Sequence, residues 1–131
     1  MPFVIDSSCL AKLVADEPGW QTLRDWYLHQ QKEDERIEAP TLALYEFGRF
    51  LEGRLQGAPP ELMEEYHART LAGIVFREPP IADAFGLASS GSTFYDASFI
   101  ALAQASGATL VSADRGMLEL AGRIGVRTLR F

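Results

Sequence analysis

Short apolar runs alternate with amphipathic stretches along this chain of 131 residues. Apolar and β-branched residues cluster as in buried strands at five places, and between them apolar residues recur at helical spacing. We expect strands near residues 2–5, 37–39, 74–76, 109–112 and 126–130. We expect helices after Asp6 and near residues 18–31, 40–55, 59–72, 79–89, 96–106 and 115–123. Such alternation predicts an α/β fold with a mostly parallel sheet, and the length predicts a single domain spanning residues 1–131.

The composition is that of an ordinary globular protein, with 47% hydrophobic and 23% charged residues. One cysteine, Cys9, allows no internal disulfide, and no stretch approaches the roughly 20 apolar residues of a membrane span. We therefore expect a cytoplasmic protein without membrane contact. The net charge of −6 argues against a generic nucleic-acid coat protein. Two bound divalent cations add four positive charges and would change it to −2.

Four acidic residues stand in unusual places. Asp6 and Asp114 each follow a predicted strand, Glu46 interrupts the apolar face of a predicted helix, and Asp96 opens another helix. In parallel sheets, ligands bind outside the carboxyl ends of the strands where the winding reverses. If the four carboxylates converge there, a cation must neutralise them or some must stay protonated. Oxygen ligands of this kind suit Mg²⁺ or Mn²⁺, which indicates metal-dependent phosphoryl chemistry.

Each acid also has a simpler interpretation. Asp6, Asp96 and Asp114 can each cap the helix that follows, because carboxylates are favoured at helix N-termini. Glu46 can form an ordinary ion pair with Arg49, three residues further on. Asp96 nevertheless shares a helical face with apolar residues, and an ionised Glu46 on an apolar face is costly without a partner.

Two serines and the cysteine complete the candidate chemistry. Ser8 and Ser112 each stand two residues from an acid, Asp6 and Asp114 respectively. Each hydroxyl can hydrogen-bond to a metal-binding carboxylate or to a metal-bound water and so orient it. Alternatively, each can simply cap a helix locally. Cys9 has no histidine near it in sequence, so we interpret it as a small buried apolar residue.

Four segments together carry a family resemblance. They are Val4–Ser8, Glu46 on the helix after Ala39-Pro40-Thr41, Tyr95–Ala103, and Leu110–Asp114. In this order and spacing the chain resembles the PIN-domain ribonucleases, especially VapC-type toxins of prokaryotic toxin–antitoxin pairs. The resemblance covers nearly the whole chain. The last two segments are its most specific part, and residues 56–92 are generic.

The resemblance implies a PIN-like three-layer α/β/α fold with about five parallel strands, and Mg²⁺- or Mn²⁺-dependent cleavage of RNA. It implies that Asp6, Glu46, Asp96 and Asp114 hold the metal and are the catalytic residues. Ser8 matches a small polar position of the first motif, and Ser112 a position that is often threonine. The family also implies homodimers and an antitoxin whose C-terminal segment, often with an arginine, occupies the groove. A homodimer is expected too because five helical aromatic residues exceed what one small core readily absorbs: Trp20, Trp26, Tyr27, Phe47 and Phe50.

Other small α/β proteins with acids at strand ends fit less well. A phospho-receiver domain needs adjacent acids after its first strand, where Ser7 follows Asp6 here, and a phosphoacceptor aspartate after its third. A haloacid-dehalogenase-like phosphatase needs Asp-x-Asp in place of Asp6-Ser7-Ser8. The alternative that remains is a non-catalytic PIN-like RNA-binding or scaffold module, which an RNase assay separates from the nuclease.

Overall fold

The computed structural model describes all 131 residues and contains one parallel sheet of five strands in the order β3-β2-β1-β4-β5. The strands are β1 (Phe3–Ile5), β2 (Ile37–Ala39), β3 (Ile74–Phe76), β4 (Thr109–Ser112) and β5 (Thr128–Arg130). The helices are α1 (Ser7–Ala15), α2 (Trp20–Lys32), α3 (Leu42–Arg54), α4 (Pro60–Leu71), α5 (Ile81–Ala88), α6 (Phe94–Ser106) and α7 (Arg115–Arg123). The expected α/β class and the parallel sheet are confirmed.

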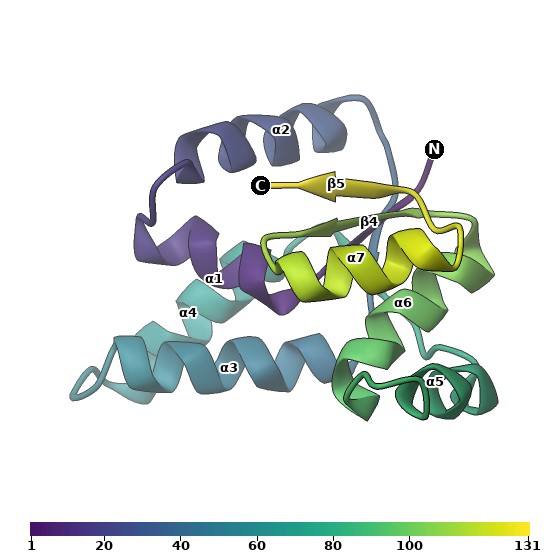
Figure 1. The fold of residues 1–131 in the computed structure, drawn as a ribbon. Helices are drawn as coiled ribbons and strands as arrows, with labels where there is room; N and C mark the ends of the chain where they lie inside the picture. Colours follow the sequence, from purple (N-terminus) through teal and green to yellow (C-terminus); the bar gives the residue numbers. More distant parts are fainter.

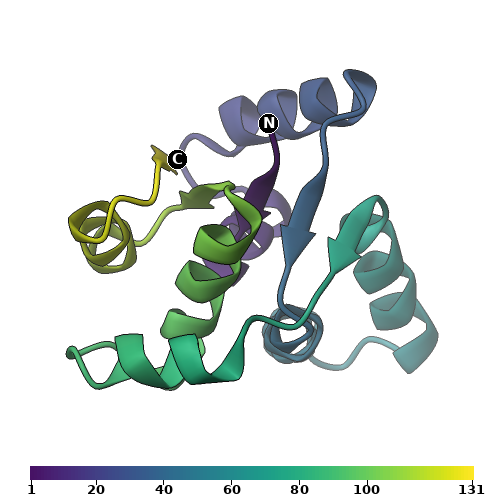
Figure 2. The same ribbon diagram turned by 90° about the vertical axis from the view of Figure 1, so that its right-hand side faces the viewer.

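Helices cover both faces of the sheet, which gives three layers. Helix α6 packs against β1 and β4 on one face, and α1 and α2 lie on the opposite face (Figures 1 and 2). This is the arrangement that parallel strands require, because their crossover helices must bury the sheet on both sides. No helix of the protein is long and apolar enough to cross a membrane.

The register places the ends of β1 and β4 side by side. Ile5 pairs with Val111, and the amide of Asp6 continues the ladder by donating to the carbonyl of Val111 at 3.1 Å. From β1 the chain winds to β2 and β3, whereas from β4 it winds to β5 on the other side. The winding therefore reverses between β1 and β4, which meets the condition for Asp6 and Asp114 to face the same edge of the sheet.

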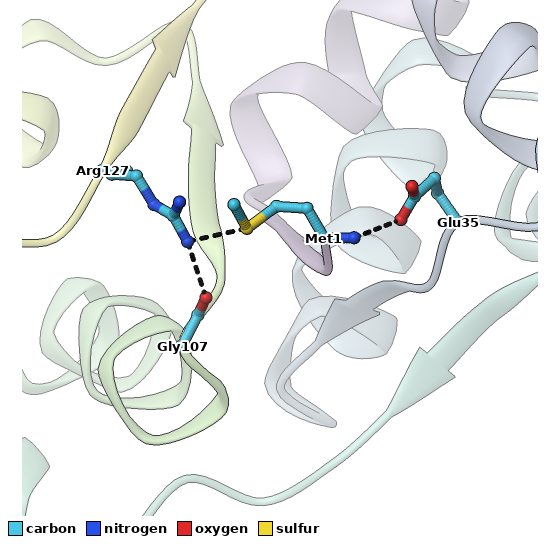
Figure 3. Close-up of polar contacts among 4 residues, drawn as sticks. All are labelled: Met1, Glu35, Gly107 and Arg127. Atoms are coloured by element: carbon cyan, nitrogen blue, oxygen red, sulfur yellow. Dashed lines mark hydrogen bonds and ion pairs between the residues drawn. The ribbon is translucent and has the colours of Figure 1, made fainter.

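The N-terminus packs at the amino end of β1, opposite the strand end that precedes Asp6. The Met1 ammonium group lies 2.7 Å from a carboxylate oxygen of Glu35. The Arg127 guanidinium group donates to the carbonyl of Gly107 at 3.1 Å and contacts the Met1 sulfur atom (Figure 3). These contacts hold the amino end of β1 in place, at the end of the strand opposite Asp6.

The core absorbs most of the aromatic residues that were expected to require a partner subunit. Tyr27 and Phe47 are buried, and Phe50 packs partly buried against the core. Trp26 lies between Phe3 and Phe131, at ring-centroid distances of 5.0 and 5.3 Å. The argument for a homodimer from these side chains was therefore wrong, because the core takes up Tyr27, Phe47 and Phe50 and two aromatic rings flank Trp26.

Candidate active site

Asp6 and Asp114 both cap helices at the point where the winding reverses. Asp6 follows β1 and accepts a hydrogen bond from the amide of Cys9 at 3.2 Å. Asp114 follows β4 and accepts one from the amide of Met117, also at 3.2 Å. The capping interpretation of both acids is thus correct. It does not exclude a second role, because each carboxylate keeps further acceptor capacity.

Two serine hydroxyls hold the buried carboxylate of Asp6, which is only 2% exposed. Ser8 donates to Oδ1 at 2.6 Å, and Ser112 donates to Oδ2 at 2.5 Å. Each serine oxygen also accepts a backbone amide from the β4–α7 connection: Ala113 donates to Ser8 and Asp114 donates to Ser112. The two hydroxyls therefore join the carboxyl ends of β1 and β4 through one carboxylate.

Glu46 lies on α3 and accepts a hydrogen bond from the hydroxyl of Ser7 at 2.8 Å. Its expected alternative partner, Arg49, is exposed and forms no ion pair in the structure. The ordinary ion-pair interpretation of Glu46 was wrong, because the side chain is directed to the start of α1. Ser7 was not singled out from the sequence, although its place directly after Asp6 was a signal.

Asp96 does not cap α6. The helix begins at Phe94, two residues earlier than expected, because the Thr93 hydroxyl accepts the amide of Asp96 at 3.1 Å and acts as the cap. Asp96 therefore stands in the first turn with its half-buried carboxylate free of the capping role. The capping interpretation of this acid was wrong. A threonine three residues before an acid is a known pattern at helix starts, and it could have identified Thr93 as the cap.

The four acids influence one another electrostatically. Burial raises the pKa of Asp6, and the negative charge of Asp114 raises it further, against the opposing hydrogen bonds. Burial likewise raises the pKa of Glu46, with added repulsion from Asp96 and Asp6. Burial also raises the pKa of Asp96, and the charge of Asp114 adds to it. Each carboxylate thus lies close enough to two of the others for their charges to repel.

The donor set fits a small divalent cation, although its atoms are not gathered around one point. No three acid, histidine or cysteine side chains lie close enough together in the structure to hold a metal ion. However, Oε2 of Glu46 and Oδ2 of Asp114 accept no hydrogen bond from the protein. Carboxylate oxygens that carry repelling charges, and that keep free lone pairs, are the ligands that Mg²⁺ and Mn²⁺ prefer, usually together with several waters.

Two open clefts border the acids. The first, of about 240 Å³, lies between the α5–α6 connection and α7 and is lined by Asp96 and Asp114 together with Ser92 and Thr93. The second, of about 250 Å³, is lined by Glu46 and its neighbours on α3 and by Tyr95 at the start of α6. Sequence reasoning did not find these flanking residues, because only the fold brings α3 and α6 together.

Comparison with known proteins shows which family the chain is similar to. The family described as PIN domain matches residues 3–123. The chain is 31% identical over 132 residues to the protein named exonuclease VapC9 of Pyrobaculum aerophilum, covering 97% of this chain and 92% of that one. A crystal structure from the same organism is similar, with a TM-score of 0.71, 28% identity, and coverage of 98% and 92% of the two chains.

A more distant structure shares the fold. The crystal structure of FitAcB from Neisseria gonorrhoeae has a TM-score of 0.63 and 17% identity, covering 98% of this chain and 96% of that one. The family match spans nearly the whole chain, from β1 to the end of α7. This chain belongs to the PIN-domain family.

Proposed function

We propose that this protein is a Mg²⁺- or Mn²⁺-dependent endoribonuclease and the toxin of a type II toxin–antitoxin pair, active in the cytoplasm. The observation that carries the proposal is the group of four mutually repelling carboxylates where the winding of the sheet reverses. Membership of the PIN-domain family and the likeness to a protein named as a VapC nuclease support the same reaction class.

Asp6, Glu46, Asp96 and Asp114 would hold the cations. When bound, such cations lower the pKa of a water and offset charge on the leaving oxygen. The protein's own contribution is orientation: the hydroxyls of Ser8 and Ser112 fix both oxygens of Asp6, and Ser7 fixes one oxygen of Glu46. Water attacks phosphorus and the bond to the 3′-oxygen breaks. The products therefore carry a 5′-phosphate and a 3′-hydroxyl.

The open clefts favour cleavage within a strand. The related protein is named an exonuclease, whose substrate must present a chain end. Here the acids line two separate open clefts, Asp114 one and Glu46 the other, which leaves room for a strand to continue past the acids. A circular single-stranded RNA distinguishes the two modes, because only an endonuclease opens it.

The test is cleavage of end-labelled and circular RNA by highly purified protein. We expect Mg²⁺ or Mn²⁺ to support cleavage, excess EDTA to abolish it, and Glu46→Gln to reduce it at least about a hundredfold. Glu52→Gln, an exposed position on the same helix, is the matched control and should retain activity. Full cleavage in excess chelator would sink the proposal. RNA binding without cleavage under any metal would favour the non-catalytic RNA-binding or scaffold module.

Two protein partners belong to this proposal. A cognate antitoxin segment that carries an arginine can neutralise the acids and block the groove. A homodimer is supported by α5, where Ile81 is 50% and Phe85 62% exposed, and Phe85 contacts the ring of Phe94 at a centroid distance of 4.5 Å. Exposed apolar side chains grouped in this way are typical of protein interfaces.

A further inference from the structure

The cleft beside Glu46 has aromatic walls that the proposed chemistry does not use. It is lined by Leu42, Tyr45, Glu46 and Arg49 of α3 and by Tyr95 of α6, and we call it the tyrosine cleft. Tyr45 is 73% and Tyr95 60% exposed, and neither hydroxyl bonds to the protein. Each tyrosine directly precedes one of the four acids. Their rings are therefore held at the edge of the candidate active site without a packing role in the core.

A free cation accompanies these rings. Arg49 lies four residues after Tyr45 on α3, lines the same cleft and pairs with no carboxylate. A second tyrosine–arginine pair in the protein behaves differently. Tyr66 and Arg69 line a separate cleft on α4, where Arg69 is engaged by Glu65 at 2.6 Å. Only the tyrosine cleft combines open aromatic faces, an unpaired guanidinium group and a site acid.

The position of the cleft suggests its ligand. Glu46 lines the tyrosine cleft, and Asp96 and Asp114 line the other cleft, so a strand that places a phosphate at the acids lies next to both. Every nucleobase has a flat π-face that stacks on an aromatic ring, and a guanidinium group binds a phosphate through paired donors. A duplex offers no unstacked base to such a cleft, so the chemistry fits a single strand.

Building on the proposed nuclease activity, we propose that the tyrosine cleft is a stacking subsite for one nucleobase of single-stranded RNA, next to the scissile phosphate. Tyr45 and Tyr95 contact the faces of the base, and Arg49 contacts a phosphate beyond it. Because stacking reads no base edges, the subsite selects for single strands and tolerates every base.

The first test measures binding without cleavage. The background is Asp114→Asn, which keeps the cap of α7 because asparagine is an equally good capping residue, while cleavage is lost. The probe is a fluorescein-labelled single-stranded oligoribonucleotide in Mg²⁺, followed by anisotropy. We expect Tyr45→Ala and Tyr95→Ala each to weaken binding between about fivefold and about a hundredfold. Tyr45→Phe should bind within about twofold of the parent because it keeps the ring. Tyr66→Ala is the matched control and should change nothing.

An abasic scan assigns the effect to stacking. Removal of the base at one position should weaken binding to the parent protein, and the same removal should cost little in Tyr45→Ala or Tyr95→Ala. Arg49→Gln should lower the slope of log affinity against log salt by about 0.7, the value of one phosphate contact on a single strand. The proposal is overturned if removal of the base weakens binding as much in both tyrosine variants as in the parent protein. It is also overturned if both variants bind the intact RNA as tightly as the parent.

The outcomes also separate this inference from the proposed function. If the wild type cuts no RNA while the abasic penalty depends on the tyrosines, the nuclease proposal fails and the subsite stands. If the wild type cuts RNA and the tyrosine variants bind and cut equally well, the subsite fails and the nuclease stands. If the tyrosine variants bind RNA normally but lose binding of an arginine-containing antitoxin peptide, the cleft serves a protein partner and the proposal is overturned.

Discussion

The hydroxyl of Ser112 donates to Oδ2 of Asp6 at 2.5 Å, although 106 positions separate the two residues in the chain. The same oxygen atom of Ser112 accepts the amide of Asp114. One side chain thus fixes the carboxylate of one acid and the backbone of a second. Because β1 and β4 both end here, this contact joins the two strand ends that carry Asp6 and Asp114.

Ser112→Ala tests that dependence. The change leaves Oδ2 of Asp6 and the amide of Asp114 without partners, which should lower the free energy of unfolding by about 1–3 kcal/mol. It should also reduce cleavage by about 10–100-fold, the usual effect of a residue that orients a metal ligand. Ser112→Thr keeps the hydroxyl and should therefore retain most of the wild-type stability and most of the wild-type cleavage rate. Ser98→Ala is the control, because that buried hydroxyl bonds only to a carbonyl of its own helix. Equal losses in the alanine and threonine variants would contradict the prediction.

Asp6→Asn separates capping from charge. Asparagine caps α1 about as well as aspartate, so the helix should remain. Burial and the charge of Asp114 raise the pKa of Asp6, which means that its charge destabilises the metal-free fold. The metal-free variant should therefore be at least as stable as the wild type in urea unfolding, while cleavage falls sharply. The metal-induced rise in Tm should shrink. A variant that stays active with the full metal-induced shift would remove Asp6 from the site.

The raised pKa values of Asp6, Glu46 and Asp96 predict how pH acts on the metal-free protein. As pH rises through the ordinary values of 3.8 for aspartate and 4.5 for glutamate, the unfolded chain releases protons before the folded protein does. The folded state then binds more protons, so these groups lower the free energy of unfolding with rising pH until the folded pKa values are passed. Urea midpoints in EDTA between about pH 4 and about pH 7 measure this. The decrease in the free energy of unfolding with rising pH should be smaller in Asp6→Asn than in the wild type. An identical pH profile in the two proteins would contradict this prediction.

Local signals in the sequence were enough to predict the fold class and to place two acids at strand ends. Strands at 37–39 and 74–76 were predicted at their observed bounds, whereas the pairing of β1 with β4 was only a condition of the argument and is established by the sheet order. The start of α6 was missed because Thr93 supplies a cap that competes with Asp96. The Ser7–Glu46 contact and the tyrosine cleft were missed because α1, α3 and α6 meet only in the folded chain.

The burial of Glu38 was also missed, because this residue ends the charged segment Lys32–Glu38, which by itself indicates a loop that leads into the strand. Its side chain is fully buried in β2, where Oε1 lies 3.0 Å from the guanidinium group of Arg77 and 3.5 Å from that of Arg36. Its Oε2 atom has no hydrogen-bond partner. The Ser106 hydroxyl at the end of α6 also donates to Oε1 at 3.5 Å. These contacts join β2 to Arg36 directly before it, to Arg77 directly after β3, and to α6.

The Glu38 cluster predicts an asymmetric response to mutation. Arg77 is 51% exposed, so water can solvate it after Glu38→Gln, and the cost should be only about 1 kcal/mol. Arg77→Gln instead leaves a buried carboxylate with only the longer contacts to Arg36 and Ser106, and the cost should approach about 3 kcal/mol. Urea unfolding of the two variants measures the difference. A larger loss in Glu38→Gln than in Arg77→Gln would contradict this account.

The exposed apolar face of α5 predicts the oligomeric state. If Ile81 and Phe85 are covered by a second copy, then Phe85→Asp places a charge in an apolar interface and should convert a dimer to a monomer in light scattering at tens of micromolar. The variant should keep its fold, because Phe85 is 62% exposed in the isolated chain. Leu28→Asp is the matched control: Leu28 is 52% exposed on α2, away from α5, and its replacement should leave the dimer intact. A wild-type protein that is monomeric at this concentration would refute the homodimer, and a dimer that survives Phe85→Asp would place the interface on another face.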